Sequence, residues 1–242
     1  MDRQIIVIKG FSKTPEELEL DRHYSQTYMN FFNSRAGGAY SAAEIQYHED
    51  ISAADLNKLT KALISDFIIL VLIGHGATQV DNQLFQLNEK EIIRPGQLEF
   101  SAPKQMILLE SCRSEIEGVF SVDLNDKIPK FKYGGVVRSP ITREQARQLY
   151  NEQLASCKDG QVVCFACAKG QAATNYYFSL VLLQAAFDWH LGPGPHLKTM
   201  NIDFAMDYIM PEVNRLSTEA GTGPQTPTIL PSIPFPFAVS KF

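Results

Sequence analysis

Asp66-Phe-Ile-Ile-Leu-Val-Leu-Ile-Gly-His75-Gly76 is the most informative segment of this chain. Seven consecutive apolar residues, Phe67 to Ile73, lead directly into a histidine that has a glycine on either side. A strand that is apolar on both faces belongs in the middle of a sheet covered on both sides, and such sheets are usually parallel. Open parallel sheets bind ligands at the carboxyl ends of their strands. The segment therefore predicts an α/β fold with His75 at the functional edge of the sheet.

A second segment has the same design and ends in a cysteine. It reads Gln105-Met-Ile-Leu-Leu-Glu110-Ser-Cys112-Arg113-Ser114. If the two strands are parallel neighbours, His75 and Cys112 leave the sheet side by side at one edge. A thiol beside an imidazole is the arrangement of a cysteine nucleophile and its base. Because a free cysteine has a pKa of about 8.5, the thiol needs such a neighbour to react at neutral pH.

Together these motifs resemble those of the caspase and metacaspase-like cysteine peptidases. Gly-His-Gly after an apolar strand is similar to the family's histidine motif, and Glu110-Ser-Cys-Arg-Ser114 is similar to the Asp-x-Cys motif of its bacterial and metacaspase branches. Further segments resemble the next strand with its small-residue loop, the helix after it and the closing segment, in the family's order: Val162 to Ala173, Phe178 to Leu183 and Gln225 to Leu230.

The resemblance implies a fold and an activity. The expected fold is a caspase-like three-layer α-β-α sandwich with a mostly parallel sheet of about six strands, formed by residues 1–242 as a single peptidase domain. The expected activity is that of a cysteine endopeptidase in which Cys112 attacks the peptide bond and His75 transfers protons. The backbone amides of Gly76 and Cys112 are expected to form the oxyanion hole. No third catalytic residue is evident, and the family works with a dyad.

The resemblance also implies a substrate preference. In the metacaspase-like branch, an acid two residues before the nucleophile helps bind a basic P1 side chain, and Glu110 matches that position. Alternation along a strand puts residues 110 and 112 on the same side. The chain lacks the Gln-Ala-Cys motif of animal caspases, which prefer Asp at P1. We therefore expect cleavage after Arg or Lys, unless Arg113 occupies Glu110. Asp21 is a candidate second acid of this pocket, with a solvated helix acid as the alternative.

The remaining segments predict an alternation of strands and helices. Arg113 to Ser139 reads as a long loop whose basic residues are candidate self-cleavage sites. Pro15 follows Thr14 at a helix start with two acids in the first turn. The expected elements are strands at 4–9, 44–48 and 161–168, helices at 15–33, 52–64, 142–150, 175–190 and 201–217, a hairpin at 80–87 over the catalytic edge, and an extended proline-rich tail at 227–236 on the surface or a sheet edge.

Composition excludes several other classes of protein. The 242 residues carry a net charge of -5 without a basic cluster, which argues against a nucleic-acid partner. No apolar run reaches the roughly 18 residues of a membrane span, and the N-terminus lacks a signal peptide, so we expect a cytoplasmic protein. We expect no cofactor and no metal. Cys164 and Cys167 form a CxxC that reads as core thiols, with metal or redox chemistry as the alternative.

Two other functions are alternatives to the peptidase. One is a catalytically silent caspase-fold regulator or scaffold. Another is a nucleotide- or flavin-binding module, against which stands the absence of a Gly-x-Gly-x-x-Gly turn and of a Walker lysine motif. Cys167, which also ends an apolar strand, is the rival nucleophile. Protein or peptide substrates with a basic P1 residue, and an activating partner, are the expected partners, whereas scattered acids do not indicate calcium dependence.

Overall fold

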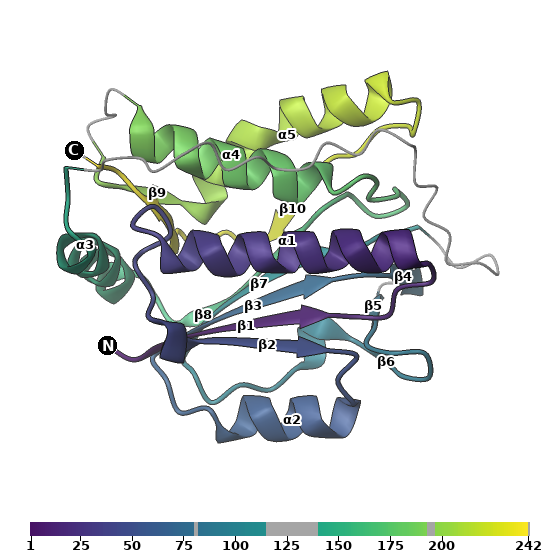
Figure 1. Cartoon of the computed structure of the whole chain (residues 1–242), viewed down its shortest axis with the longest axis horizontal. Coiled ribbons are helices and arrows are strands. Elements are labelled where there is room, and N and C mark those ends of the chain that lie inside the picture. The colour runs from purple at the N-terminus through teal and green to yellow at the C-terminus, as the bar shows by residue number, and fades with distance from the viewer. Residues whose placement is uncertain (80–81, 115–139, 193–196, 242) are drawn as a thin grey trace.

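The computed structural model describes residues 1–79, 82–114, 140–192 and 197–241. Within them the main sheet has six strands in the order β10-β8-β7-β3-β1-β2 (Figure 1). Five of these strands are parallel, and only β10 is antiparallel to its neighbour β8. The strands are β1 (Arg3–Lys9), β2 (Ile45–Glu49), β3 (Phe67–Ile73), β7 (Lys104–Glu110), β8 (Gly160–Phe165) and β10 (Thr228–Leu230).

Helices cover both faces of this sheet, as expected. In Figure 1, α1, α4 and α5 lie on one face and α2 on the other. Alternate residues of β3 enter different cores: Ile69 and Val71 join the core shared with α1 and α4, whereas Leu70 and Leu72 join the core of α2. The three-layer α-β-α sandwich is therefore confirmed. The helices are α1 (Pro15–Asn33), α2 (Ala53–Ala62), α3 (Arg143–Ser156), α4 (Tyr177–Leu191) and α5 (Ile202–Glu219).

Helix starts follow the capping residues of the sequence. Thr14 accepts a hydrogen bond from the backbone N–H of Glu17, whose carboxylate accepts from the backbone N–H of Thr14, so that a complete capping box opens α1. Ser52 caps α2 by accepting from the backbone N–H of Asp55. The carboxylate of Asp55 accepts from the Ser52 hydroxyl instead of reaching the Ser52 backbone, because Asp is one methylene shorter than Glu.

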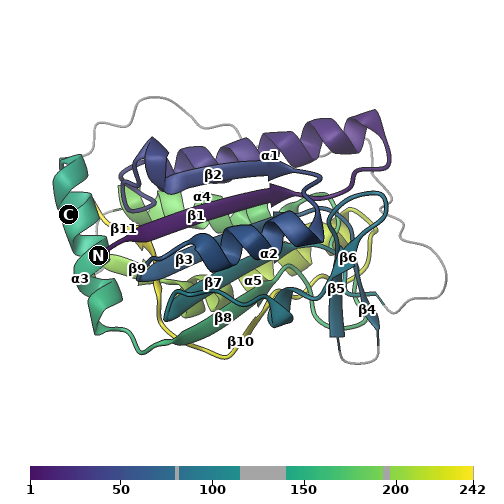
Figure 2. The ribbon, with the colours of Figure 1, turned by 90° about the horizontal axis from the view of Figure 1, so that it is seen from below.

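The carboxyl ends of β3 and β7 meet at one edge, because Ile73 and Glu110 are partners in their parallel register. A small antiparallel sheet covers this edge, as Figures 1 and 2 show. It consists of β4 (Gly76–Gln79), β5 (Asn82–Gln86) and β6 (Ile92–Ile93), which confirms the expected hairpin. A Cβ on Gly10 would collide with the carbonyl oxygen of Gln86, so the glycine after β1 lets β5 approach the main sheet.

The C-terminal tail lies at the sheet edge, as expected, and then continues into a buried strand. β10 does lie at the sheet edge, but β11 (Pro236–Val239) is buried and pairs antiparallel with β9 (Thr199–Asn201), a strand that no sequence pattern indicated. The ring of Phe237 lies 5.1 Å from that of Phe31 in α1. Burial of such apolar side chains offsets the poor strand propensity of the prolines. The expected position at a sheet edge is thus confirmed for β10, whereas residues 235–239 enter the core.

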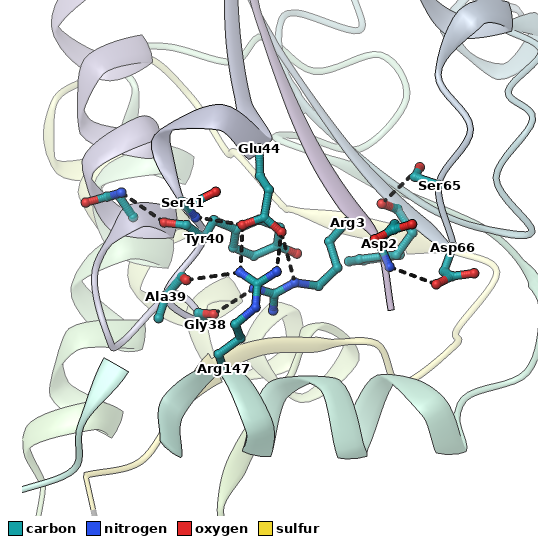
Figure 3. A network of polar contacts seen from close by, with 12 residues as sticks. Asp2, Arg3, Gly38, Ala39, Tyr40, Ser41, Glu44, Ser65, Asp66 and Arg147 are labelled. Atoms are coloured by element: carbon teal, nitrogen blue, oxygen red, sulfur yellow. Dashed lines mark hydrogen bonds and ion pairs between the residues drawn. The ribbon is translucent and has the colours of Figure 1, made fainter. Parts of the chain in front are cut away.

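A buried charge network lies at the opposite end of the sheet, near the N-terminus (Figure 3). Arg3 is fully buried against the ring of Tyr40, 3.9 Å away, and its Nε lies 3.9 Å from the Glu44 carboxylate. Arg147 of α3 donates two hydrogen bonds of 2.6 Å to the same carboxylate. Although burial opposes ionisation, the hydrogen bonds from Arg147 and Ser41 lower the pKa of Glu44 to about 2. The network ties α3 to the start of β1.

Candidate active site

His75 lies in the short segment between β3 and β4. Gly74 has a φ of 147°, which an L-residue rarely adopts, and its N–H donates to the carbonyl of Glu110. The carbonyl of His75 accepts a 2.9 Å hydrogen bond from the backbone N–H of Gln86 in β5. The backbone at His75 is therefore fixed from both sheets, while its buried side chain faces α1.

The side chain of His75 contacts an acid, Glu17, that no sequence motif indicated as a site residue. Its Nε2 lies 3.2 Å from Oε2 of Glu17, and both side chains are buried. Glu17 is the third residue of α1 and belongs to the capping box with Thr14. The capping signal was present in the sequence, but nothing in it indicated that the same carboxylate reaches a histidine 58 residues away.

Cys112 leaves the sheet two residues after β7. Its thiol donates to the carbonyl of Ala173 at 3.3 Å, and only 7% of the residue is exposed. The neighbouring backbone is held by Gln83, whose Nε2 donates to the Cys112 carbonyl at 3.0 Å. Among the described residues no hydrogen bond joins Cys112 to His75, although both line one pocket.

Burial sets the protonation of both groups in this resting arrangement. It raises the pKa of the Cys112 thiol, and the negative charge of Glu110 acts in the same direction. It lowers the pKa of His75, which the hydrogen bond and charge of Glu17 oppose. A neutral thiol and a neutral imidazole therefore face the pocket near neutral pH.

Glu110, the last residue of β7, is buried in the same pocket. Its Oε2 accepts hydrogen bonds from the backbone N–H of Ser179 at 2.8 Å and from the Ser179 hydroxyl at 2.6 Å, both in the first turn of α4. Burial raises the pKa of Glu110 to about 7 against these hydrogen bonds, and the charge of Asp21 adds to the rise. Since both hydrogen bonds go to Oε2, the other oxygen keeps its capacity to bind a ligand.

Asp21 lies on the second turn of α1 and is not the solvated acid of the alternative interpretation. It is 3% exposed, and it accepts hydrogen bonds of 2.7 Å from the hydroxyls of Ser12 and Tyr176. Burial raises its pKa to about 6 against these two hydrogen bonds. The structure thus brings Asp21 and Glu110 together at one pocket.

The pocket is narrow, with about 30 Å³ of space. One wall is the segment before α4, where Asn175 and Tyr176 have φ values of 53° and 54°, an unusual conformation for two consecutive non-glycine residues. The Tyr176 ring stacks on Tyr24 with 4.7 Å between ring centroids. The pocket is lined by Glu17, Asp21, Gly74, His75, Glu110, Ser111, Cys112, Ala173, Asn175 and Tyr176.

Gly76, the expected oxyanion donor, begins β4 immediately beside this pocket. A Cβ at this position would lie 2.5 Å from the Ser111 hydroxyl oxygen, so the glycine permits close packing against the segment that carries Cys112.

Arg113 does not pair with Glu110. Its guanidinium donates to Gln83, to the Cys167 carbonyl and to Thr228, and it stacks 4.0 Å from the ring of Phe165.

Cys164 and Cys167, the CxxC pair, are both buried free thiols. Burial raises the pKa of both. The Cys167 thiol donates to the carbonyl of Gln171 at 3.3 Å and does not line the pocket of His75.

Within the described ranges there is no cluster of three or more His, Cys, Asp or Glu residues that could hold a metal ion. In the same ranges, no helix has the length and apolarity needed to cross a membrane.

The fold is similar to that of solved caspases. Caspase-1 from Spodoptera frugiperda aligns over 99% of this chain and 89% of its own, with a TM-score of 0.54 and 9% identity. The Drosophila initiator caspase Dronc aligns over 98% of this chain and 82% of its own, with a TM-score of 0.54 and 10% identity. No protein-family model matches the chain, and no curated protein matches its sequence. The chain thus has a caspase-like fold.

Proposed function

We propose that this protein is a cysteine endopeptidase that uses Cys112 and His75. The observation that supports it most is the meeting of these two residues with Glu110 and Asp21 in one pocket, at the carboxyl edge of a caspase-like sheet. These four side chains come from three segments that lie far apart in the chain. A thiol and an imidazole can act as nucleophile and base, and carboxylates can bind a basic P1 side chain.

The proposed reaction begins with a substrate carbonyl beside the Cys112 sulfur. The thiol proton passes to the imidazole of His75 as the sulfur forms a bond to the carbonyl carbon. The oxyanion is held by the backbone amides of Gly76 and Cys112. As the carbon–nitrogen bond breaks, the imidazolium gives its proton to the leaving amine. Water then hydrolyses the thioester, with His75 accepting its proton, and the thiol is restored.

The proposed specificity comes from the two buried acids. A guanidinium or ammonium group near Glu110 and Asp21 would replace the water that burial removes, and it would favour the charged form of both carboxylates. Tyr176, which also lines the pocket, contacts one of these two acids. Its hydrogen bond to Asp21 is the contact that the basic group would displace.

A catalytically silent regulator is the second candidate, favoured by one observation. The Cys112 thiol is bonded to the Ala173 carbonyl instead of to His75, and burial raises its pKa. A protein that keeps this arrangement with substrate present would bind peptides without cleaving them. Reaction of Cys112 with iodoacetamide at neutral pH, at a rate above that of the free amino acid, would argue for the peptidase.

A panel of fluorogenic tetrapeptides with Arg, Lys, Asp or Leu at P1 tests the proposal. We expect cleavage after Arg and Lys that is lost in Cys112→Ala and kept in Cys157→Ala, which removes a buried thiol that does not line the pocket. Glu110→Gln keeps an acceptor for Ser179 and removes the charge, so it should reduce cleavage of the basic peptides selectively. Undiminished cleavage by Cys112→Ala would refute the nucleophile, and cleavage after Asp alone would refute the specificity.

The expected self-cleavage in residues 113–139 concerns a segment that, beyond Ser114, lies outside the described residues. Self-processing stays a proposal that follows from basic specificity. Intact mass of the active enzyme after prolonged incubation, with Cys112→Ala as control, is the measurement for it. Fragments should appear only with the intact thiol.

A further inference from the structure

We infer that Glu17 is a positioning residue for His75, a role that rests on the proposed function and extends the expected dyad. Oε2 of Glu17 lies 3.2 Å from His75 Nε2, and neither side chain is more than 6% exposed. An acid buried against an imidazole at this distance is a specific contact and not a surface ion pair. It comes from α1, whereas His75 follows β3, so the packing of the helix on the sheet brings them together (Figure 1).

The Glu17 carboxylate is fixed before any substrate arrives. The oxygen that faces His75 also accepts hydrogen bonds from the backbone N–H groups of Lys13 at 2.6 Å and Thr14 at 3.4 Å. The carboxylate also lies at the N-terminus of α1, where a negative charge interacts favourably with the helix dipole. The capping box therefore holds an anion at a fixed place beside the imidazole.

This contact determines which nitrogen of His75 carries the proton. An ionised carboxylate only accepts hydrogen bonds, so Nε2 must be the donor, and the neutral imidazole then has Nδ1 as its basic nitrogen. The only hydrogen bond of the His75 ring to a described residue is made by Nε2, and the proposed reaction assigns Nδ1 to the thiol of Cys112. When His75 takes the thiol proton, the negative charge of Glu17 stabilises the imidazolium.

Other charged and titratable groups surround this pair, and the test must separate their effects. Lys13 opposes Glu17 by lowering the pKa of His75, though burial and Glu17 have the larger effects. The groups that line the same pocket are Asp21 from α1, Glu110 and Cys112 from the end of β7, and Tyr176 from the segment before α4. A variant at Glu17 leaves all of these in place.

The first experiment is NMR titration of the His75 imidazole nitrogens in nitrogen-15-labelled protein, assigned with His75→Gln. In the wild type we expect the tautomer with a proton on Nε2. Glu17→Gln is nearly isosteric and keeps an acceptor for the helix cap, but it removes the charge, so His75 should titrate at a lower pH. Thr14→Ala is the matched control, because it weakens the same cap without touching His75. It should lower the melting temperature and leave the titration of His75 unchanged.

The second experiment is the pH profile of kcat/KM for a peptide with Arg at P1. In Glu17→Gln we expect kcat/KM to fall about tenfold or more. The limb of the profile controlled by His75 should move to lower pH, and Thr14→Ala should keep the wild-type limb. If Glu17 only stabilised the helix, both variants would have changed melting temperatures, and the pH limb controlled by His75 would stay in place in both.

The outcomes separate this inference from the proposed function. If peptides are cleaved but His75 has the same tautomer and titration in wild type and Glu17→Gln, the inference is wrong and the peptidase stands. If His75 responds to Glu17 as expected but no peptide is cleaved, the positioning contact is real and the proposed function fails.

Discussion

Glu110 should lower the stability of the folded protein at alkaline pH, and replacing it with Gln should restore that stability. Burial raises its pKa from 4.5 to about 7. Below pH 4.5 the carboxyl is protonated in both the folded and the unfolded chain and costs nothing. Between pH 4.5 and 7 the unfolded chain ionises first, so the stability of the fold falls as the pH rises. Above pH 7 the cost is complete, at about 3 kcal/mol for such a shift in pKa.

Urea unfolding at pH 4 and pH 8 measures this effect. We expect Glu110→Gln to match the wild type within about 1 kcal/mol at pH 4 and to be more stable at pH 8 by up to about 3 kcal/mol. The Gln oxygen can still accept from Ser179, so the packing of α4 is kept. Glu89→Gln, in an exposed loop, should show no such difference between the two pH values.

The same experiment can refute the reasoning. If Glu110→Gln is less stable than the wild type at pH 8, the ionised carboxylate is stabilised by its surroundings, and burial does not dominate its pKa. The functional meaning would change too, because an acid that costs stability when unliganded is one expected of a binding site. If Glu110→Gln stabilises the fold and also reduces cleavage of basic peptides, the ionised Glu110 lowers stability while it serves substrate binding.

Two further predictions use the same kinds of contact. Since Glu110 has a pKa of about 7, the KM for peptides with Arg at P1 should rise several-fold from pH 8 to pH 6, while KM for a Leu peptide stays constant; a parallel rise for both peptides would contradict it. Glu44→Gln removes the counter-charge of the buried Arg3, so urea unfolding should show a free energy of unfolding lower by about 3 kcal/mol. The control Glu212→Gln breaks an exposed pair with Arg215 and should lower it by under about 1 kcal/mol. Equal losses would refute the role of burial at Arg3.

Much of the fold could be predicted because local patterns carried it. The apolar run from Phe67 to Ile73 became the central strand β3, and Thr14, which precedes the proline and the two acids of a helix start, caps α1. Parallel pairing of β3 with β7 followed from two apolar segments of similar design. In each case a run of apolar residues or a capping residue, all within a short segment, determines the structure.

The candidate site was less predictable because its contacts depend on how distant elements pack. Glu17 was visible as a capping acid, but its place beside His75 depends on the packing of α1 against the edge of β3. The sequence allowed two interpretations of Asp21, a second acid of the pocket or a solvated helix acid. Its contacts with Tyr176 and Ser12, which depend on tertiary packing, distinguish between them. Ser179, which holds Glu110, had no local signal. The proline-rich tail was predicted at a sheet edge, where β10 lies, but no local pattern indicated that residues 236–239 form a buried strand paired with β9.

Covalent labelling of the nucleophile tests the central claim most directly. The protein would be incubated at neutral pH with a peptidyl chloromethyl ketone that carries Arg at P1, and the adduct located by intact mass and peptide mapping. We predict one adduct per chain, on Cys112, and no adduct in Cys112→Ala. A reagent with Leu at P1, even in excess, should label Cys112 far more slowly. An adduct on Cys157, Cys164 or Cys167, or a fully folded protein that takes up no reagent, would contradict the assignment of Cys112 as a catalytic nucleophile.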